Sequence, residues 1–185
     1  MKKYWVQYKP FLLFLGKFTL TYLVLTFAYQ YYLNQFDVKD HEVDGFTKIV
    51  TGQVEQTLLF FNCDARTEVH PMEPSYKFFY NGKYISRIVE GCNALSVIIL
   101  FIAFVIAFSG KLKHTILFIM GGSLVIHILN ITRIALLMVA FYNFPEFNTF
   151  LHDIVFPLAI YGTVFILWVI WVNKFSFYAK KTAQS

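Results

Sequence analysis

Four apolar stretches constrain this chain more than any other feature. A helix needs about 20 predominantly apolar residues to cross a hydrocarbon core roughly 30 Å thick. We predict membrane-spanning helices over residues 11–33, 93–109, 115–141 and 154–172. Hydrophobic residues make up 57% of the chain and charged residues only 15%, a balance that excludes an ordinary soluble domain. The predicted fold class is therefore an all-α polytopic membrane protein, forming a single domain over residues 1–185.

The charges in the connecting segments predict an orientation in the membrane. The N-terminal segment, the short link after the second stretch and the tail contain lysines and no acids: Lys2, Lys3, Lys9, Lys111, Lys113, Lys174, Lys180 and Lys181. The link 34–91 carries nine acidic against six basic residues, and the link 142–153 carries two acids and no base. Basic residues favour the cytoplasmic side. We therefore expect both termini in the cytoplasm and both acidic links outside, in the cell (inner) membrane, with no nucleic-acid partner.

The long outer link 34–91 carries two local patterns. Apolar residues recur at helical spacing over 46–61, which predicts an amphipathic helix lying on the outer leaflet. Two β-prone runs then flank Asn81-Gly82, a dipeptide that suits the positive φ angles of a type I′ turn. This pattern predicts a short β-hairpin over 76–88.

Polar residues inside the predicted spans are the candidate functional residues. An arginine at the centre of a membrane helix costs about 2.5–3.5 kcal/mol on insertion scales, and Arg133 lies in the third span. His127, Asn130 and Arg133 are spaced by three, so they share one side of that helix. In the expected topology, Cys92 and His152 begin the second and fourth spans at the outer side. A thiol, a guanidinium group and an imidazole would then meet at one depth.

These three groups together indicate acyl transfer. Cys92 would attack an acyl carbon, His152 would carry the proton, and Arg133 would stabilise the oxyanion. His127 and Asn130 would support Arg133. A cysteine in the first turn of a helix also faces the positive end of the macrodipole, which stabilises a thiolate. The sequence has no spacing typical of metal ligands, so we expect neither a metal nor a cofactor.

The same residues also have structural interpretations. Cys92 could be an apolar filler or form a disulfide with Cys63, and Arg133 could pair with Asp153 or Glu146. A non-enzymatic membrane scaffold or assembly protein is then the alternative. A small proton-linked transporter that uses His127, Asn130 and Arg133 is a second alternative.

The order of these motifs resembles one known family. Glu90-Gly91-Cys92-Asn93, then Asn130-Ile131-Thr132-Arg133, then His152-Asp153 is similar to the exosortase/archaeosortase family, and to its small exosortase F (XrtF) branch. The resemblance covers roughly residues 89–172. It implies a membrane cysteine transpeptidase or protease with Cys92, Arg133 and His152 as catalytic residues, and with Asn93 and Asp153 among the supporting ones.

The resemblance also implies a substrate class. Enzymes of this family process exported proteins that end in a C-terminal sorting signal, which consists of a short motif, a hydrophobic helix and a basic tail. The expected partners are that tail helix, the membrane lipid and an unknown lipid or glycan acceptor. The active site would face the extracytoplasmic side.

Overall fold

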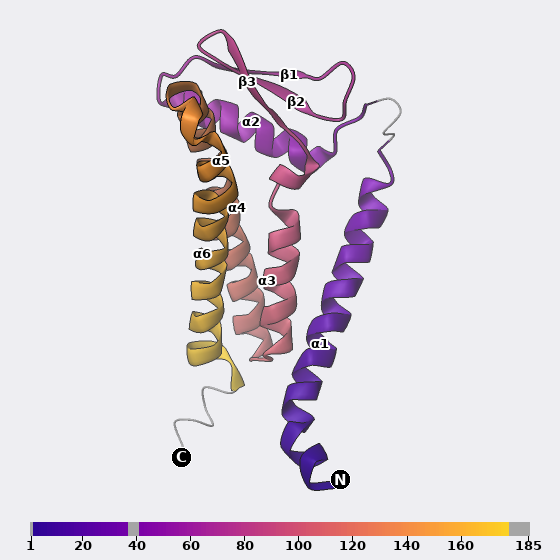
Figure 1. Ribbon diagram of the computed structural model, residues 1–185. Coiled ribbons are helices and arrows are strands. Elements are labelled where there is room, and N and C mark those ends of the chain that lie inside the picture. The colour runs from indigo at the N-terminus through magenta and orange to yellow at the C-terminus, as the bar shows by residue number, and fades with distance from the viewer. Residues whose placement is uncertain (1, 37–40, 178–185) are drawn as a thin grey trace. The chain divides into compact units, whose positions relative to one another are not determined.

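The computed structural model describes residues 2–36 and 41–177, with side chains from Tyr8 onward. Most of these residues are helical (Figure 1). The longer helices are α1 (Lys2–Leu33), α2 (Gly45–Phe60), α3 (Leu95–Ala107), α4 (Leu112–Asn143) and α6 (Phe156–Ile170). Shorter helical segments are η2 (Glu90–Cys92), η3 (Pro145–Phe147), α5 (Asn148–Phe150), η4 (Leu151–Val155) and η5 (Trp171–Phe175). The expected topology depends in part on Lys180 and Lys181, which lie outside the described residues.

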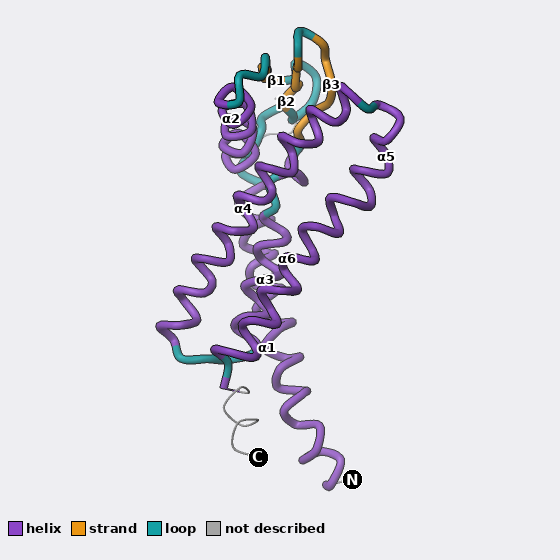
Figure 2. Tube along the Cα trace, turned by 90° about the vertical axis from the view of Figure 1, so that its left-hand side faces the viewer, coloured by secondary structure: helices purple, strands orange, loops and turns teal. Residues whose placement is uncertain are grey.

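Three of the helices described are long and apolar enough to cross a membrane. They cover Tyr8–Leu33, Leu112–Asn143 and Pro145–Phe175, and they contain the predicted spans 11–33, 115–141 and 154–172. The last of them starts before residue 154, so the expected outer link 142–153 is largely helical. Pro145 favours an extended residue before it, and Phe144 has φ −135° and ψ 61°. Figure 2 shows this break between α4 and α5.

The predicted span 93–109 is too long. Its helix, α3, has 13 residues, Leu95–Ala107, and its length is about 20 Å at 1.5 Å per residue. At the start, the Leu95 N–H donates to the side-chain oxygen of Asn93 over 2.9 Å, and Ala94 has a positive φ of 60°. At the other end, Ser109 has a φ of 37°. These left-handed residues end the helical backbone on both sides.

The contacts divide the chain into two compact units. The first contains residues 2–30, 96–124 and 163–177, and the second contains the described residues of 31–95 together with 125–162. Aromatic side chains pack the first unit: Phe104 stacks on Trp168 with ring centroids 4.2 Å apart, and Phe14 lies 4.5 Å from Phe108.

The second unit contains a three-stranded antiparallel sheet. Its strands are β1 (Ala65–Val69), β2 (Tyr76–Tyr80) and β3 (Lys83–Ile88), in the order β1-β2-β3. The predicted hairpin is confirmed, because Asn81 and Gly82 both have positive φ angles, 49° and 71°. Strand β1 was not predicted from the sequence. Its residues are mostly polar, and only Ala65 is buried.

Helix α2 lies against this sheet (Figure 1). A helix was predicted over nearly the same residues, but Val50, Val54 and Leu58 are buried in a protein core with Phe78 of β2. On the rest of α2, Phe46 and Ile49 stay exposed. Contact of these exposed side chains with the outer leaflet stays a prediction. The core also takes Ile134, Ala135 and Met138 from α4, so the sheet, α2 and the end of α4 pack together.

Gly122 should be essential for packing in the first unit. A Cβ on Gly122 would overlap the ring of Phe101, which is fully buried, so this ring would have to shift within the core. We expect Gly122→Ala to destabilise the protein by about 1–3 kcal/mol, as overpacked cores do. Thermal unfolding of the purified protein measures this loss. Gly121→Ala is the matched control, because nothing lies within 4 Å of its added Cβ; equal stability of the two variants would refute this packing.

Candidate functional site

Cys92 ends the 3₁₀ turn η2 and does not lie in α3. The expectation that it occupies the first turn of that helix is therefore wrong. The helix starts three residues later because Asn93 caps it and Ala94 takes the left-handed conformation. The positive end of the α3 macrodipole is then not an argument for a stabilised thiolate, since that effect falls off within one turn.

A buried hydrogen bond holds the Cys92 turn against α4. The Asn130 side-chain amide donates from Nδ2 to the Cys92 carbonyl oxygen over 2.7 Å, and Asn130 is only 1% exposed. The half-buried Cys92 side chain packs on the same hydrophobic core as Ile131. The sequence predicted Asn130 as a support for Arg133; the structure shows that its amide binds the cysteine turn.

The predicted polar stripe is present on α4. His127 Nε2 lies 2.9 Å from the side-chain oxygen of Gln53 on α2. Arg133 follows Asn130 by three residues, about 4.5 Å along the helix axis. Its side chain is half-buried, and its Nε is enclosed without a hydrogen-bond partner in the described part of the chain. The stripe therefore bonds α2 through His127 and the cysteine turn through Asn130.

His152 lies in the π-helical segment η4, at the start of the last long helix. Its Nδ1 is 2.6 Å from Asp153 Oδ1, and its side chain is 55% exposed. Within residues 2–36 and 41–177, no hydrogen bond or ion pair joins His152 to Cys92 or Arg133. The contact with Asp153 engages Nδ1 and leaves Nε2 outside this pair. The meeting of all three groups stays a prediction.

The two cysteines are free thiols, and neither is fully buried. The disulfide between Cys63 and Cys92 that the sequence left open is not formed. Cys63 instead lies beside Tyr80 of β2. Its hydrogen bond to the phenol, followed by burial, raises the pKa of Tyr80 above its usual value.

Sequence reasoning missed two polar residues of α2. Gln53 holds His127, and Thr47 accepts a hydrogen bond of 3.4 Å from the Asn93 side chain. Thr47 is fully buried and Asn93 is 4% exposed. Gln53 lies outside the apolar residues that recur over 46–61, and no pattern in the sequence indicates that α4 packs against that face.

Among the described residues, no group of three His, Cys, Asp or Glu side chains could bind a metal ion. In the comparisons with known proteins, no family model, curated protein or solved structure matches this chain.

Asn130→Ala tests how tightly the cysteine turn is held. Removing the amide leaves the part-buried Cys92 carbonyl without its donor, and an acceptor left unsatisfied costs up to about 1–3 kcal/mol when it is buried. We expect thermal stability to fall by that amount and alkylation of Cys92 by a water-soluble maleimide to become faster.

The control is Asn143→Ala on the same helix. Asn143 is exposed and its amide bonds only its own helix, at the Val139 carbonyl oxygen over 2.8 Å. If both alanine variants changed stability and alkylation equally, the Asn130 hydrogen bond would not be what holds Cys92.

Proposed function

We propose that this protein is a membrane cysteine transpeptidase or peptidase of the exosortase type. It cleaves the C-terminal sorting signal of exported proteins through a thioester on Cys92 and passes the protein to a lipid or glycan acceptor. The observation that carries the proposal is the Asn130 hydrogen bond, which fixes the cysteine turn beside the polar stripe of α4.

The proposed chemistry assigns one task to each group. The Cys92 thiolate attacks the scissile carbonyl, and Arg133 stabilises the oxyanion that develops. Support for this role is the enclosed Arg133 Nε, which has no partner within the described residues and therefore has a donor to offer. Charge stabilisation is stronger in a site from which water is excluded.

His152 supplies the proton transfers. It protonates the departing amine and then takes a proton from the acceptor. Asp153 orients the imidazole through Nδ1, as the 2.6 Å contact supports. For this role η4 must bring His152 Nε2 toward the thioester, a movement of the exposed side chain.

We place the site on the extracytoplasmic face of the cell (inner) membrane. The lysine distribution supports cytoplasmic termini. In this proposal α3 is a fourth membrane segment in addition to the three long apolar helices. The substrate's tail helix packs laterally against the bundle by shape, since hydrophobicity distinguishes protein from lipid only weakly.

A membrane scaffold is the second candidate, and one observation favours it. Two members of the polar stripe, His127 and Asn130, already bond α2 and the cysteine turn. Such bonds would hold elements together without any chemistry. This alternative predicts that the Cys92 thiol is dispensable, whereas the enzyme requires it.

Replacing the thiol separates the two candidates. We expect Cys92→Ala and Cys92→Ser to insert and fold normally, because the carbonyl that accepts from Asn130 remains. Maturation of exported proteins with a hydrophobic helix and basic tail should fall at least 100-fold. Quantitative mass spectrometry of C-terminal peptides in the native host measures it.

Cys63→Ala is the matched control, since it removes the other thiol of the second unit. Normal maturation in the two Cys92 variants would reject the enzyme and favour the scaffold. Loss of maturation in Cys63→Ala as well would mean that the assay reports stability instead of catalysis.

A further inference from the structure

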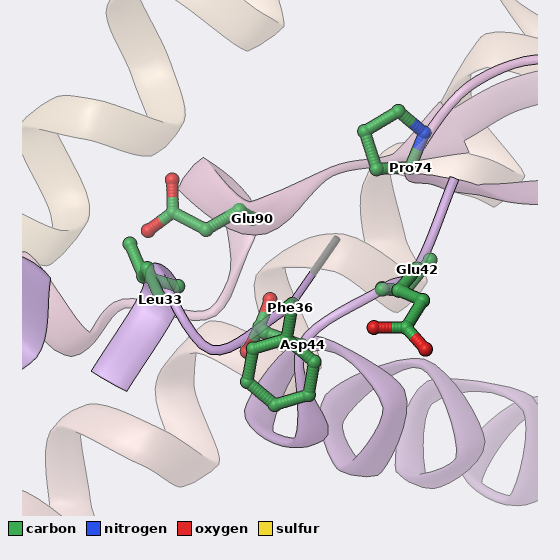
Figure 3. A pocket seen from close by; sticks show the side chains of 7 residues that line it. Leu33, Phe36, Glu42, Asp44, Pro74 and Glu90 are labelled. Carbon is green, nitrogen blue, oxygen red and sulfur yellow. The ribbon is translucent and has the colours of Figure 1, made fainter. Parts of the chain in front are cut away.

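Charge is divided unequally between the two units. All acidic residues that the structure describes belong to the second unit, where Glu42, Asp44 and Glu90 line a pocket (Figure 3). The first unit has no acid over its described residues. A surface that carries one sign of charge attracts partners of the other sign. The first unit therefore suits an anionic partner, because it has five lysines with described side chains: Lys9, Lys17, Lys111, Lys113 and Lys174.

A backbone contact gathers three of these lysines at one end of the first unit. Gly110 pairs with Ser176 in an isolated antiparallel bridge. The bridge joins the link between α3 and α4, which carries Lys111, to the end of η5, which carries Lys174. Lys113 follows in the first turn of α4. All three side chains are exposed.

Lys17 reaches the same link from α1. Its Nζ donates to Ser109 Oγ over 2.8 Å, and this bond is exposed. Within the described residues, neither Lys17 nor the Ser109 hydroxyl makes another hydrogen bond or ion pair. An ammonium group has three donors, and the Ser109 hydroxyl keeps its own proton to donate. The pair can therefore donate further hydrogen bonds to a phosphate group, the kind of charge-assisted bond that is strong.

The depth of Lys17 points to a phosphate that belongs to the membrane. Lys17 lies inside the apolar segment Tyr8–Leu33, 16 residues before its end (17 to 33). These residues span about 24 Å, whereas the hydrocarbon core is about 30 Å thick. With Leu33 at one boundary, Lys17 is then about 6 Å inside the other. An ammonium group there is costly unless it reaches a headgroup.

The same face of α1 provides an apolar surface for acyl chains. Leu20, Val24 and Phe27 follow Lys17 at helical spacing, so they share its side of the helix. They are 66%, 57% and 69% exposed. A soluble anion would gain nothing from this surface. An apolar helix packed on it would cover Lys17 without supplying a counter-charge, which is unfavourable in a membrane.

We propose that this end of the first unit binds the headgroup of an anionic phospholipid. Lys17 Nζ and Ser109 Oγ donate to its phosphate, and Lys111 and Lys174 add attraction. The acyl chains lie along the exposed side of α1. The headgroup is drawn below the level of its neighbours, so the bilayer is thinner beside α1, as it must be beside the 13-residue helix α3. This site is independent of Cys92 and of the proposed enzyme.

Native mass spectrometry of the full-length protein tests this site. The micelles contain equal amounts of phosphatidylglycerol and phosphatidylcholine; both lipids carry a phosphate, but the latter also carries a cation that lysines repel. We expect the monomer to retain phosphatidylglycerol in preference. Lys17→Gln should lower this preference about fivefold, the contribution of one lysine near an anionic lipid. Lys17→Arg keeps the charge and should keep the preference.

Lys9→Gln is the matched control. Lys9 is an exposed lysine of the same helix, about 12 Å before Lys17 along the axis. Its replacement should leave the preference nearly unchanged. The measurement is a ratio of two lipids on one protein, so a general loss of stability does not imitate the result. No preference in the parent protein, or an equal preference in Lys9→Gln and Lys17→Gln, would overturn the proposal.

Glycerol phosphate distinguishes a lipid from a soluble anion, because it is the same headgroup without acyl chains. Added in excess, it should not displace the retained phosphatidylglycerol. Displacement would identify a site for soluble anions and would overturn the lipid assignment. Retention confined to dimers would assign this face of α1 to a second copy of the chain and would overturn it as well.

Discussion

The hydrogen bond from Asn130 to the Cys92 carbonyl is the interaction on which the candidate site depends. A buried amide is costly unless it is paired, and the Nδ2 of Asn130 takes its partner from the turn that follows β3, whereas its Oδ1 has none among the described residues. The bond fixes the cysteine turn at one level of α4. His127 and Arg133 lie three residues to either side of Asn130, and a position of Arg133 beside the thiol is part of the proposal.

The two sides of α4 have different environments. One side carries the stripe, whose His127 and Asn130 bond to other elements of the second unit. Elsewhere on the helix, Ile128 and Leu136 are more than half exposed, as suits contact with lipid. The stripe is therefore shielded by α2 and the cysteine turn. The Nε of Arg133 is enclosed and has no hydrogen-bond partner among the described residues, and the oxyanion role proposed for Arg133 rests on this donor.

Local patterns in the sequence predicted local structure well. Asn81-Gly82 fixed the hairpin because only a few residues accept two consecutive positive φ angles. The start of α3 was predicted two residues too early, because the sequence does not show that Asn93 would cap the helix from outside and that Ala94 would take a positive φ. The pairing of Gln53 with His127 was also unpredictable, because it depends on how α2 packs against α4. The stripe itself followed from helical spacing, whereas a contact between His152 and Cys92 requires a tertiary arrangement that no local pattern encodes.

The central claim is that the Cys92 side chain lies beside Arg133. Disulfide cross-linking in native membranes tests it directly, because a disulfide requires Cα atoms roughly 4.4–6.8 Å apart. In a Cys63→Ala background, Arg133→Cys should cross-link to Cys92 under mild oxidation. Leu136→Cys, on an exposed part of the same helix, should not. Failure of the cysteine at 133 to cross-link, or equal cross-linking from both positions, would contradict the account.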